Sequence, residues 1–347
     1  MPESSATTEH GALTPEPIHR VLLAYCGSKA LMSAVELDLF SVLAQDGPAT
    51  EPELRRKLGL HPRLARHFLD ALVALDLLRA DGERYANSPV ADHFLDRAKP
   101  TCIGGFAEMT SDTFYPAWGR LTKALRTGQA QAPQPPDDED HLFRVNAKEQ
   151  PDRVRRFMAS MDSHSTRIGD ELAARLDWSA RTRFADLGGA RGNLTAVIAK
   201  AHPHLRGVCF DRPQSRPFFD EHIGRLGLSD RVTFQAGDFF ADPLPAADVL
   251  IYGHVLHDWG PDSRRMLLDR AYQALPEGGA LVIYDRMLDG SPKDLSKLMY
   301  SMTFMLASAG GSEYSVDECR DWLRQAGFAR IDAQPLLHDH TVVVAHK

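Results

Sequence analysis

A glycine-rich stretch in the second half of the chain, DLGGARGN at 186–193, has the residue types of a nucleotide-binding turn. Asp186 follows an apolar run and is itself followed by three glycines, Gly188, Gly189 and Gly192. This order predicts a strand, a tight turn and a helix, in which glycine lets the backbone approach a ligand closely. It does not fit NAD or a phosphate loop, because Ala190 replaces the middle glycine of G-x-G-x-x-G and no Gly-Lys-Ser/Thr is present.

Two further acidic residues follow the next two predicted strands. Asp211 ends the run VCFD and precedes Arg212, and Asp238 is followed by an aromatic pair, Phe239 and Phe240. In such a fold the first carboxylate reaches ribose hydroxyls, and the second can accept from an exocyclic amine beside rings that stack on a purine. A negative charge at Asp186 suits an ammonium group rather than a pyrophosphate. Together these residues predict a nucleoside that carries an amino acid, which is S-adenosylmethionine.

Each acidic residue also has a purely structural interpretation. Asp186 can cap the following turn, Asp211 can be a loop residue before Pro213, and Asp238 can cap a turn above core phenylalanines. Asp186, the glycines, Asp211 and Asp238 with its aromatic pair all lie at the C-terminal ends of predicted strands. This coincidence favours the cofactor site.

The glycine loop begins a strict alternation of predicted strands and helices. Parallel strands are expected near 183–187, 206–210, 231–235, 247–252 and 280–285, which predicts a Rossmann-like, doubly wound α/β domain. After a helix near 316–327, Ala329–Leu336 and His340–Ala345 predict a C-terminal antiparallel hairpin, giving seven strands. His338 and His340 flank its turn and are expected in solvent.

The N-terminal part of the chain predicts helices. Residues 1–15 are polar and predict a disordered tail. Residues 18–43 are apolar on more than one side at helical spacing, as in a deep core or a partner subunit, and Gly27 is expected to separate two helices. A helix near 51–58, a longer one from 61 to 78 and a hairpin at Asp81–Gly82 follow the winged-helix order. That order can mark a DNA-binding regulator, but the sparse basic residues of the second helix favour a structural or dimerising role.

The bulk composition excludes several classes of protein. The formal net charge is −7 and no long basic run is present, so nucleic-acid binding is disfavoured. The four cysteines are scattered, which indicates neither a disulfide framework nor a zinc knuckle and fits a reducing cytoplasm. No signal peptide or membrane span is predicted.

Several motifs together resemble one enzyme family, the class I small-molecule O-methyltransferases. The motifs are DLGGARG, FDRP, GDFF, EGGALVIYDRML, GGSEYSVDECRDWLRQAGF and above all YGHVLHDW at 252–259. The family includes the plant caffeic acid type, bacterial antibiotic-pathway enzymes and acetylserotonin methyltransferase. The resemblance covers nearly the whole chain. It implies a homodimer that uses S-adenosylmethionine without a metal, with a winged-helix dimerisation domain at 16–100, a helical connector at 101–165 and the methyltransferase domain at 166–347.

The resemblance implies a set of catalytic residues centred on His257. An imidazole can take a phenolic proton near neutral pH, and the family's catalytic histidine maps to this position before Asp258. The family's carboxylates around that histidine map to Asp285 and Glu313. His254 and His257 are three residues apart and can bind a metal on a helical turn, but no third spaced ligand is nearby, so no metal is predicted.

The acceptor pocket is expected to be aromatic and rich in methionine, which suits a flat apolar ring. Its predicted residues are Phe106, Phe114, Trp118, Phe157, Met158, Met161, His254, Asp258, Met302 and Met305. The alternative for each is an ordinary core or dimer contact.

The predicted function is methylation of a hydroxyl group on an aromatic small molecule, in bacterial secondary metabolism. Alternatives are an N- or C-methyltransferase, a non-methylating relative, and a winged-helix regulator. Three positions depart from the family pattern: Ala190 replaces a glycine, Gly253 stands where plant members carry a lysine near the cofactor, and Asp285 is shorter than their glutamate.

Overall fold

The computed structural model describes residues 13–132, 151–290 and 294–347. Most of the predicted N-terminal tail lies outside the described residues, as do residues 133–150 of the predicted helical connector. The chain divides into two compact units, Met1–Lys99 and Pro100–Lys347. No helix among the described residues is long and apolar enough to cross a membrane.

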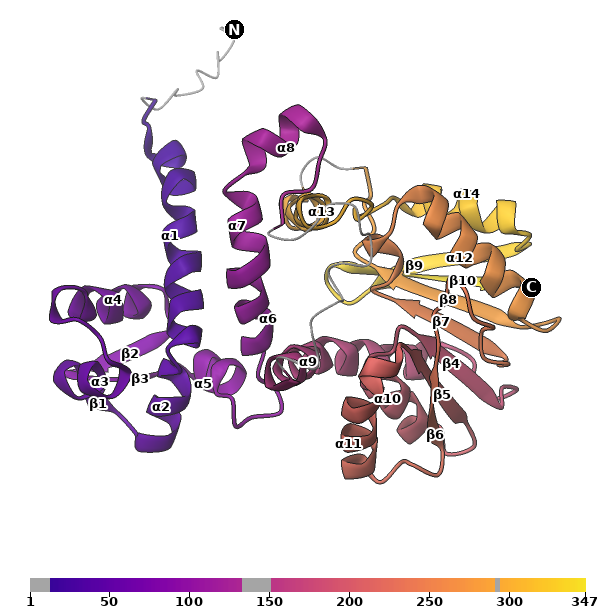
Figure 1. Cartoon of the computed structure of the whole chain (residues 1–347), viewed down its shortest axis with the longest axis horizontal. Helices are drawn as coiled ribbons and strands as arrows, with labels where there is room; N and C mark the ends of the chain where they lie inside the picture. Colours follow the sequence, from indigo (N-terminus) through magenta and orange to yellow (C-terminus); the bar gives the residue numbers. More distant parts are fainter. Residues whose placement is uncertain (1–12, 133–150, 291–293) are drawn as a thin grey trace, which may run out of the picture. The chain divides into compact units, whose positions relative to one another are not determined.

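The first unit is mostly helical, with one small antiparallel sheet of order β1-β3-β2 (Figure 1). A capping box formed by Thr50 and Glu53 begins its third helix. The order helix, turn, helix and hairpin is also the predicted one. Its elements are α1 (Glu16–Glu36), α2 (Leu39–Asp46), β1 (Ala49–Thr50), α3 (Glu51–Leu58), α4 (Pro62–Ala74), β2 (Leu78–Asp81), β3 (Arg84–Asn87) and α5 (Pro89–Leu95).

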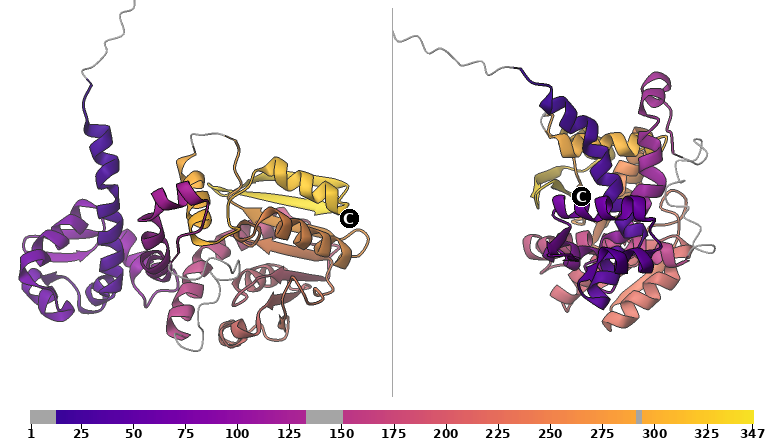
Figure 2. Two further views of the ribbon diagram at one scale, coloured as in Figure 1. Left: turned by 45° about the horizontal axis from the view of Figure 1, so that its top comes forward. Right: turned by 90° about the vertical axis from the view of Figure 1, so that its left-hand side faces the viewer.

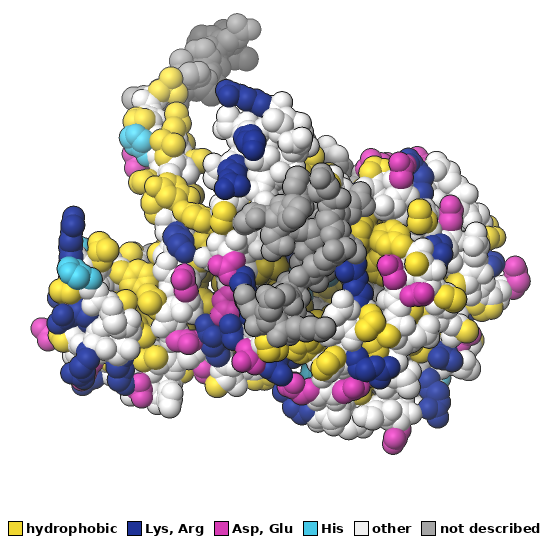
Figure 3. All heavy atoms as spheres, viewed as in Figure 1, with side chains coloured by type: hydrophobic (Ala, Val, Ile, Leu, Met, Phe, Trp, Pro, Cys, Tyr) yellow, Lys and Arg dark blue, Asp and Glu magenta, His cyan; other side chains and the backbone are white. Residues whose placement is uncertain are grey.

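Helix α1 is continuous through Gly27, so the prediction that Gly27 separates two helices is wrong. The break comes at Asp38, which has the left-handed φ of 58° and precedes α2. The N-terminal half of α1 exposes a row of large apolar side chains, coloured yellow in Figure 3: Ile18, Val21, Leu22, Leu23 and Tyr25, each 59–76% exposed.

The second unit begins with helices. Their bounds are α6 (Gly104–Met109), a π-helical turn (Thr110–Phe114), α7 (Tyr115–Trp118), α8 (Leu121–Thr127) and α9 (Pro151–Arg175). Helices α6 and α9 touch at Gly105, where a Cβ atom would lie 2.2 Å from the carbonyl oxygen of Arg156. Only glycine allows this approach, which sets α6 directly against α9.

A seven-stranded sheet of order β6-β5-β4-β7-β8-β10-β9 forms the centre of the second unit. Its parallel strands are β4 (Arg183–Leu187), β5 (Arg206–Asp211), β6 (Val232–Ala236), β7 (Val249–Gly253) and β8 (Ala280–Asp285), and the antiparallel pair is β9 (Arg330–Leu336) and β10 (His340–His346). Strand order reverses at β4, which pairs with β5 on one side and β7 on the other. Ligands bind at the carboxyl ends of strands at such a reversal, and this is where the predicted cofactor residues lie.

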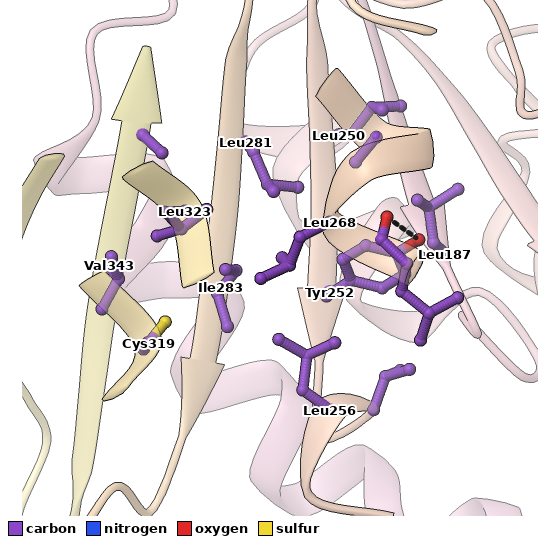
Figure 4. Close-up of a cluster of buried hydrophobic side chains, with 14 of the residues drawn as sticks. Leu187, Leu250, Tyr252, Leu256, Leu268, Leu281, Ile283, Cys319, Leu323 and Val343 are labelled. Carbon is purple, nitrogen blue, oxygen red and sulfur yellow. Dashed lines mark hydrogen bonds between the residues drawn. The ribbon is translucent and has the colours of Figure 1, made fainter. Parts of the chain in front are cut away.

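Helices cover both faces of this sheet (Figure 1; Figure 2). One face packs against α9, α10 (Asn193–Ala201) and α11 (Arg216–Leu226), and the other against α12 (Pro261–Ala274) and α14 (Val316–Ala326). Figure 4 shows the second core, in which Leu268, Ile283 and Leu323 interdigitate and Tyr252 donates a hydrogen bond to the Leu267 carbonyl, 3.4 Å away. Helix α13 (Leu295–Ala307) runs beside α7. The buried strands hold the loops at their carboxyl ends rigidly.

Candidate active site

His257 lies on a 3₁₀ turn, Leu256–Asp258, that follows strand β7. Strand β7 is an apolar, buried run, and the buried side chains of Leu256 and Trp259 anchor the turn on either side of the histidine. The carbonyl of His257 accepts a 2.8 Å hydrogen bond from the Ser312 N–H. That bond fixes the distant segment that carries Glu313 beside the turn.

The structure brings His257 together with both carboxylates that the sequence assigned to it. His257 Nδ1 lies 3.0 Å from Glu313 Oε1 and 3.4 Å from Asp285 Oδ1. On the other side of the ring, Nε2 lies 3.6 Å from Asp258 Oδ1. Because Nδ1 is at hydrogen-bond distance from Glu313, this nitrogen donates to the carboxylate. Nε2 is then the ring nitrogen that can face a methyl-accepting substrate.

The electrostatic surroundings of His257 are dominated by negative charge. Burial lowers the pKa of His257, but the opposing charges of Asp285, Asp258 and Glu313 prevail and raise it to about 10. Burial also raises the pKa of Asp258 to about 7 and that of Asp285 to about 6. Three buried oxygens, Asp258 Oδ1, Asp285 Oδ1 and Glu313 Oε2, accept a hydrogen bond from no described residue. The cluster therefore holds more negative charge than its protein partners balance.

Several residues that position this cluster escaped the sequence analysis. Tyr314 donates a 2.6 Å hydrogen bond to Asp285 Oδ2, and the buried guanidinium of Arg264 donates to the Leu256 carbonyl and to Ser312. The ring of Phe304 lies 4.2 Å from the His257 ring, centroid to centroid. Ser312 and Tyr314 flank Glu313 in the GGSEY motif, and that adjacency is the signal that could have identified them.

Of the two histidines that flank the turn of the C-terminal hairpin, one is exposed to solvent and the other is buried. His338 is exposed as predicted, but His340 is only 3% exposed, so the prediction for His340 is wrong. His340 Nε2 lies 3.2 Å from His254 Nε2, and His340 Nδ1 lies 2.7 Å from Asp339 Oδ1. The reason is the antiparallel pairing of β10 with β8, which brings the start of β10 beside Asp285. A hairpin turn that looks solvated in sequence thus lies against the site.

The glycine loop adopts the tight backbone that its sequence predicts. Gly188 and Gly192 have left-handed φ values of 81° and 78°. At Gly189 a Cβ atom would lie 2.8 Å from Asp186 Oδ2, which leaves no room for a side chain. Ala190, where the family carries a glycine, has a left-handed φ of 50°. A non-glycine residue there is strained, so the substitution has a conformational cost.

The three predicted acidic positions differ in how their oxygens are used. Asp186 is 4% exposed and accepts from Thr195 Oγ1 at 3.1 Å, and burial raises its pKa to about 7. Asp211 accepts from the backbone N–H groups of Ala190 and Arg212, both at 2.7 Å, and from Ser215 Oγ at 2.9 Å. Asp186 is therefore bonded to the helix that follows the glycine loop, whereas Asp211 holds the backbone of the loop itself.

Asp238 follows strand β6 and begins a turn. Its Oδ1 accepts from the Phe240 N–H at 2.8 Å. Phe239 and Phe240 stack edge to face with each other and with Trp259, at centroid distances of 5.0, 5.9 and 4.6 Å. Both phenylalanines also remain partly exposed. Their rings thus connect the end of β6 with the turn that carries His257.

Gly253, where plant family members carry a lysine, has a clear structural reason. A Cβ atom at this position would lie 1.9 Å from Tyr284 Cζ. Tyr284 is the cross-strand neighbour of Gly253 in the pairing of β7 with β8, and its ring fills the space that a side chain would need. The ring of the buried Tyr284 therefore occupies the space beside Gly253.

Most of the predicted acceptor-pocket residues lie on α6, α7, α9 and α13, whereas Phe114 lies on the π-helical turn and His254 and Asp258 follow β7. They differ in exposure. Trp118 Nε1 donates to Thr303 Oγ1 at 3.0 Å, and the Phe106 and Phe114 rings stack edge to face at 6.4 Å. Met305 is 57% exposed, whereas Phe304, one residue earlier, packs on His257. On α13 it is therefore Phe304, which the sequence analysis missed, that faces the histidine. Half-buried positions among the rest are Phe106, Trp118, Phe157, Met158, Met161, His254 and Met302.

A separate cavity of about 620 Å³ lies at the opposite edge of the sheet. It is lined by the first residues of β7 and β8 and by arginines such as Arg175 and Arg330. Neither His257 nor the glycine loop contributes to it. The convergent ionisable groups and the strand reversal locate the candidate site at the carboxyl edge instead.

Comparison with known proteins agrees with this geometry. Residues 19–97 match the O-methyltransferase dimerisation domain, and residues 118–329 match the O-methyltransferase domain. The tetracenomycin polyketide synthesis 8-O-methyl transferase TcmO of Streptomyces glaucescens is 46% identical over 96% of this chain and 97% of its own length. The N,N-dimethyltransferase OxyT of Streptomyces rimosus is 46% identical over 88% of each chain.

The solved structure of human N-acetylserotonin methyltransferase in complex with SAM has the same fold. It superposes with a TM-score of 0.84 at 25% identity and covers 98% of this chain and 99% of its own. The match of two family domains and the high identity to named relatives lead to one conclusion. This chain belongs to the O-methyltransferase family.

Proposed function

We propose that this protein transfers the methyl group of S-adenosylmethionine to a hydroxyl group of an aromatic polyketide-type metabolite, with His257 as the general base. The observation that carries the proposal is the arrangement of His257, whose Nδ1 is held by Glu313 and Asp285 and whose Nε2 faces the opposite way. Class membership and the 8-O-methyl transferase relative support hydroxyl methylation.

The residues at the carboxyl ends of β4, β5 and β6 fit the cofactor. A carboxylate has about four acceptor positions, and Asp211 uses three for protein donors, so a ribose hydroxyl can take the fourth. Asp238 keeps acceptor capacity beside Phe239 and Phe240, and Gly188, Gly189 and Gly192 place no side chain over the loop backbone. Arg212 borders the same edge. When bound, S-adenosylmethionine supplies a methyl group already activated on a sulfonium.

His257 has the task of removing the acceptor's proton. Nucleophilic attack by a phenol oxygen on a methyl group requires loss of its proton, and neutral Nε2 of His257 takes it. Glu313 and Asp285 then stabilise the imidazolium and keep the ring oriented. Asp258, 3.6 Å from Nε2, adds to the same electrostatic stabilisation. The raised pKa of His257, about 10, matches that of an ordinary phenol, so the proton transfer is nearly balanced; because the ring is mostly protonated at neutral pH, turnover should rise as the pH approaches 10.

An aromatic acceptor fits the side chains around His257. Phe304 stacks at 4.2 Å from the imidazole, and His254 lies at 5.4 Å from it, both measured between ring centroids. The half-buried aromatic and methionine residues of α6, α7 and α9 supply further apolar surface for a flat ring. The relative from tetracenomycin polyketide synthesis supports a polyketide acceptor.

Transfer from isotopically labelled cofactor to a matched acceptor panel tests the proposal. The panel contains hydroxylated aromatic polyketides, the same compounds already O-methylated, and amino analogues. We expect label on the hydroxylated compounds alone, at oxygen by mass spectrometry. Absence of label on every hydroxylated compound, with tight cofactor binding, would instead support a non-methylating relative.

A second candidate is N-methylation. It is favoured by the relative OxyT, an N,N-dimethyltransferase with the same 46% identity as the O-methylating relative. Preferential labelling of the amino analogues would support it. The carboxylates around His257 would then stabilise the proton released by the methylated amine.

We also propose that the chain forms a homodimer through its N-terminal part, residues 16–100, leaving 101–165 and 166–347 for acceptor and cofactor. The match of 19–97 to a dimerisation domain and the exposed apolar row on α1 support this assignment. Light scattering on the full chain should give twice the 38.5 kDa chain mass. Replacing Val21 and Leu22 by glutamate should give monomers, and a monomeric wild-type protein would contradict the proposal.

A further inference from the structure

The side of the His257 cluster that faces away from Nε2 contains a second constellation. His254 and His257 each offer a ring nitrogen, and Asp285 offers a carboxylate oxygen, with all three ligand atoms within 4.8 Å of one another. From its sequence spacing the pair of histidines lacks a third ligand. Asp285 supplies one because β8 ends beside the turn after β7.

Two distances in this constellation are close to the separation between ligands of a single metal ion. Asp285 Oδ1 lies 3.4 Å from His257 Nδ1 and 3.8 Å from His254 Nδ1, both too long for good hydrogen bonds. Ligands of a tetrahedral zinc ion, with bonds of about 2.0–2.2 Å, are separated by about 3.3–3.6 Å. Glu313 Oε1, 3.0 Å from His257 Nδ1, is within reach as a fourth ligand.

An orphaned oxygen points into the same space. Asp285 is fully buried, and its Oδ1 accepts a hydrogen bond from no described residue, while its Oδ2 is already bound by Tyr314. The other oxygen of Glu313, Oε2, is likewise buried without a described partner. Buried carboxylate oxygens of this kind normally have partners, so their clustering here calls for a cation.

The hydrogen-bond chain behind His254 sets the ring for coordination. His340 Nδ1 donates to Asp339 Oδ1, and His340 Nε2 lies 3.2 Å from His254 Nε2. In the tautomer in which His254 Nε2 donates to His340, the lone pair of His254 is on Nδ1, facing Asp285. A lone pair facing a carboxylate oxygen repels it unless a cation lies between them. Metal-binding histidines have this kind of support from their other nitrogen.

We propose that His254 Nδ1, His257 Nδ1 and Asp285 Oδ1, with Glu313 beside them, form a site for a divalent transition-metal ion of the zinc class that switches off methyl transfer. Two imidazoles and a carboxylate select zinc, cobalt and related ions over magnesium and calcium. Coordination through Nδ1 releases one proton from the His257 imidazolium to solvent and leaves the remaining ring proton on Nε2, which then cannot accept a proton from the substrate. Inhibition, but not binding, rests on the proposed function.

The binding part is tested on untagged full-length protein by titration with Zn²⁺, by visible absorption with Co²⁺ and with Mg²⁺ as a negative control. We expect one tight Zn²⁺ per chain, a tetrahedral Co²⁺ absorption band, and one proton released per ion in calorimetry across buffers. His254→Asn and Asp285→Asn should each weaken Zn²⁺ binding by more than about tenfold. His338→Asn, at the exposed histidine of the same hairpin, should bind as the wild type does.

The inhibition part is tested by measuring label transfer as the site is filled. Activity should fall in proportion to Zn²⁺ occupancy and return with EDTA. Wild-type binding no tighter than that of folded His254→Asn and Asp285→Asn variants would overturn the site, as would full activity at full occupancy. If no acceptor is ever methylated, the titration and the Co²⁺ spectrum still decide the site, and only the proposed function fails.

Discussion

The glycine loop and the His257 cluster lie at the same edge of one sheet, yet they handle polar groups in opposite ways. In the glycine loop, both oxygens of Asp211 accept from nearby donors within the protein, and Asp186 is tied to Thr195. In the His257 cluster, each of three carboxylates has an oxygen that accepts from no described residue. The loop is a finished backbone shape, whereas the cluster retains unbalanced charge.

This difference separates two kinds of function. A loop whose own groups are satisfied is a rigid surface on which a ligand can be positioned without large reorganisation. Unbalanced buried charge is costly to folding and is retained where it changes the pKa of a reacting group. Substitutions in the loop should therefore affect binding and stability, while substitutions in the cluster should affect turnover.

The largest effect is expected from His257→Ala. Loss of a positioned general base should lower kcat by about 100-fold to 10,000-fold. Cofactor affinity, measured by calorimetry, should stay within about twofold of the wild type, since the base does not contact the loop. His338→Ala is the control because that histidine is exposed. Equal losses of turnover and of cofactor affinity would erase the distinction between the two regions.

The pH dependence of the free energy of unfolding tests the unbalanced charge of the His257 cluster. The folded state raises the pKa of His257 from an ordinary 6.5 to about 10, so its interactions stabilise the fold fully below about pH 6.5. That contribution should be lost as pH rises through about 10. The measurement is the difference in free energy of unfolding between wild type and His257→Gln from pH 6 to 10.5. A difference that grows with pH would contradict the assigned protonation.

A smaller effect is expected in the loop from Asp211→Ala. Removal of a charged acceptor should weaken cofactor binding by about tenfold to a hundredfold, because charge-assisted hydrogen bonds contribute about 1.5–3 kcal/mol. Asp211→Asn, which keeps one oxygen acceptor, should lose less. Calorimetry on both variants, each checked for a wild-type thermal transition, provides the measurement. Unchanged affinity in Asp211→Ala would show that the ribose contact lies elsewhere.

The smallest effect is expected from Ala190→Gly. The left-handed φ of 50° costs an L-residue about 1–2 kcal/mol, and added freedom of the unfolded chain offsets part of the gain from glycine. The variant should be more stable by at most about 1 kcal/mol in urea unfolding. Ala196→Gly, in the regular helix α10, should be destabilised instead by about 1 kcal/mol. Destabilisation of both variants would argue against strain at Ala190.

The features predictable from the sequence are those encoded locally. The strand, glycine turn and helix at 183–201, the alternation that follows and the C-terminal hairpin appear where hydrophobic periodicity and turn residues predict them. The family resemblance, rather than local pattern, predicted Asp285 and Glu313 as neighbours of His257, and they lie 3.4 and 3.0 Å from its Nδ1.

The errors arise where tertiary contacts override local pattern. His340 looks like a turn residue, but pairing of β10 with β8 buries it beside His254. Gly27 looks like a helix break, yet α1 continues through it to Glu36, and the break before α2 comes at Asp38. On α13, both methionines look alike in sequence, and only the packing shows that Phe304 between them contacts His257. No local spacing predicts which face of a helix the rest of the fold will cover.

The most direct test of His257 as the base compares two acceptors that differ only in acidity. One is a phenol with a pKa near 10, and the other carries an electron-withdrawing group and is already ionised at the assay pH. Methyl transfer by wild type and His257→Ala is measured at saturating cofactor. We predict a large loss on the first acceptor and little loss on the second, because the ionised phenol needs no base. Equal losses on both acceptors would contradict proton removal by His257.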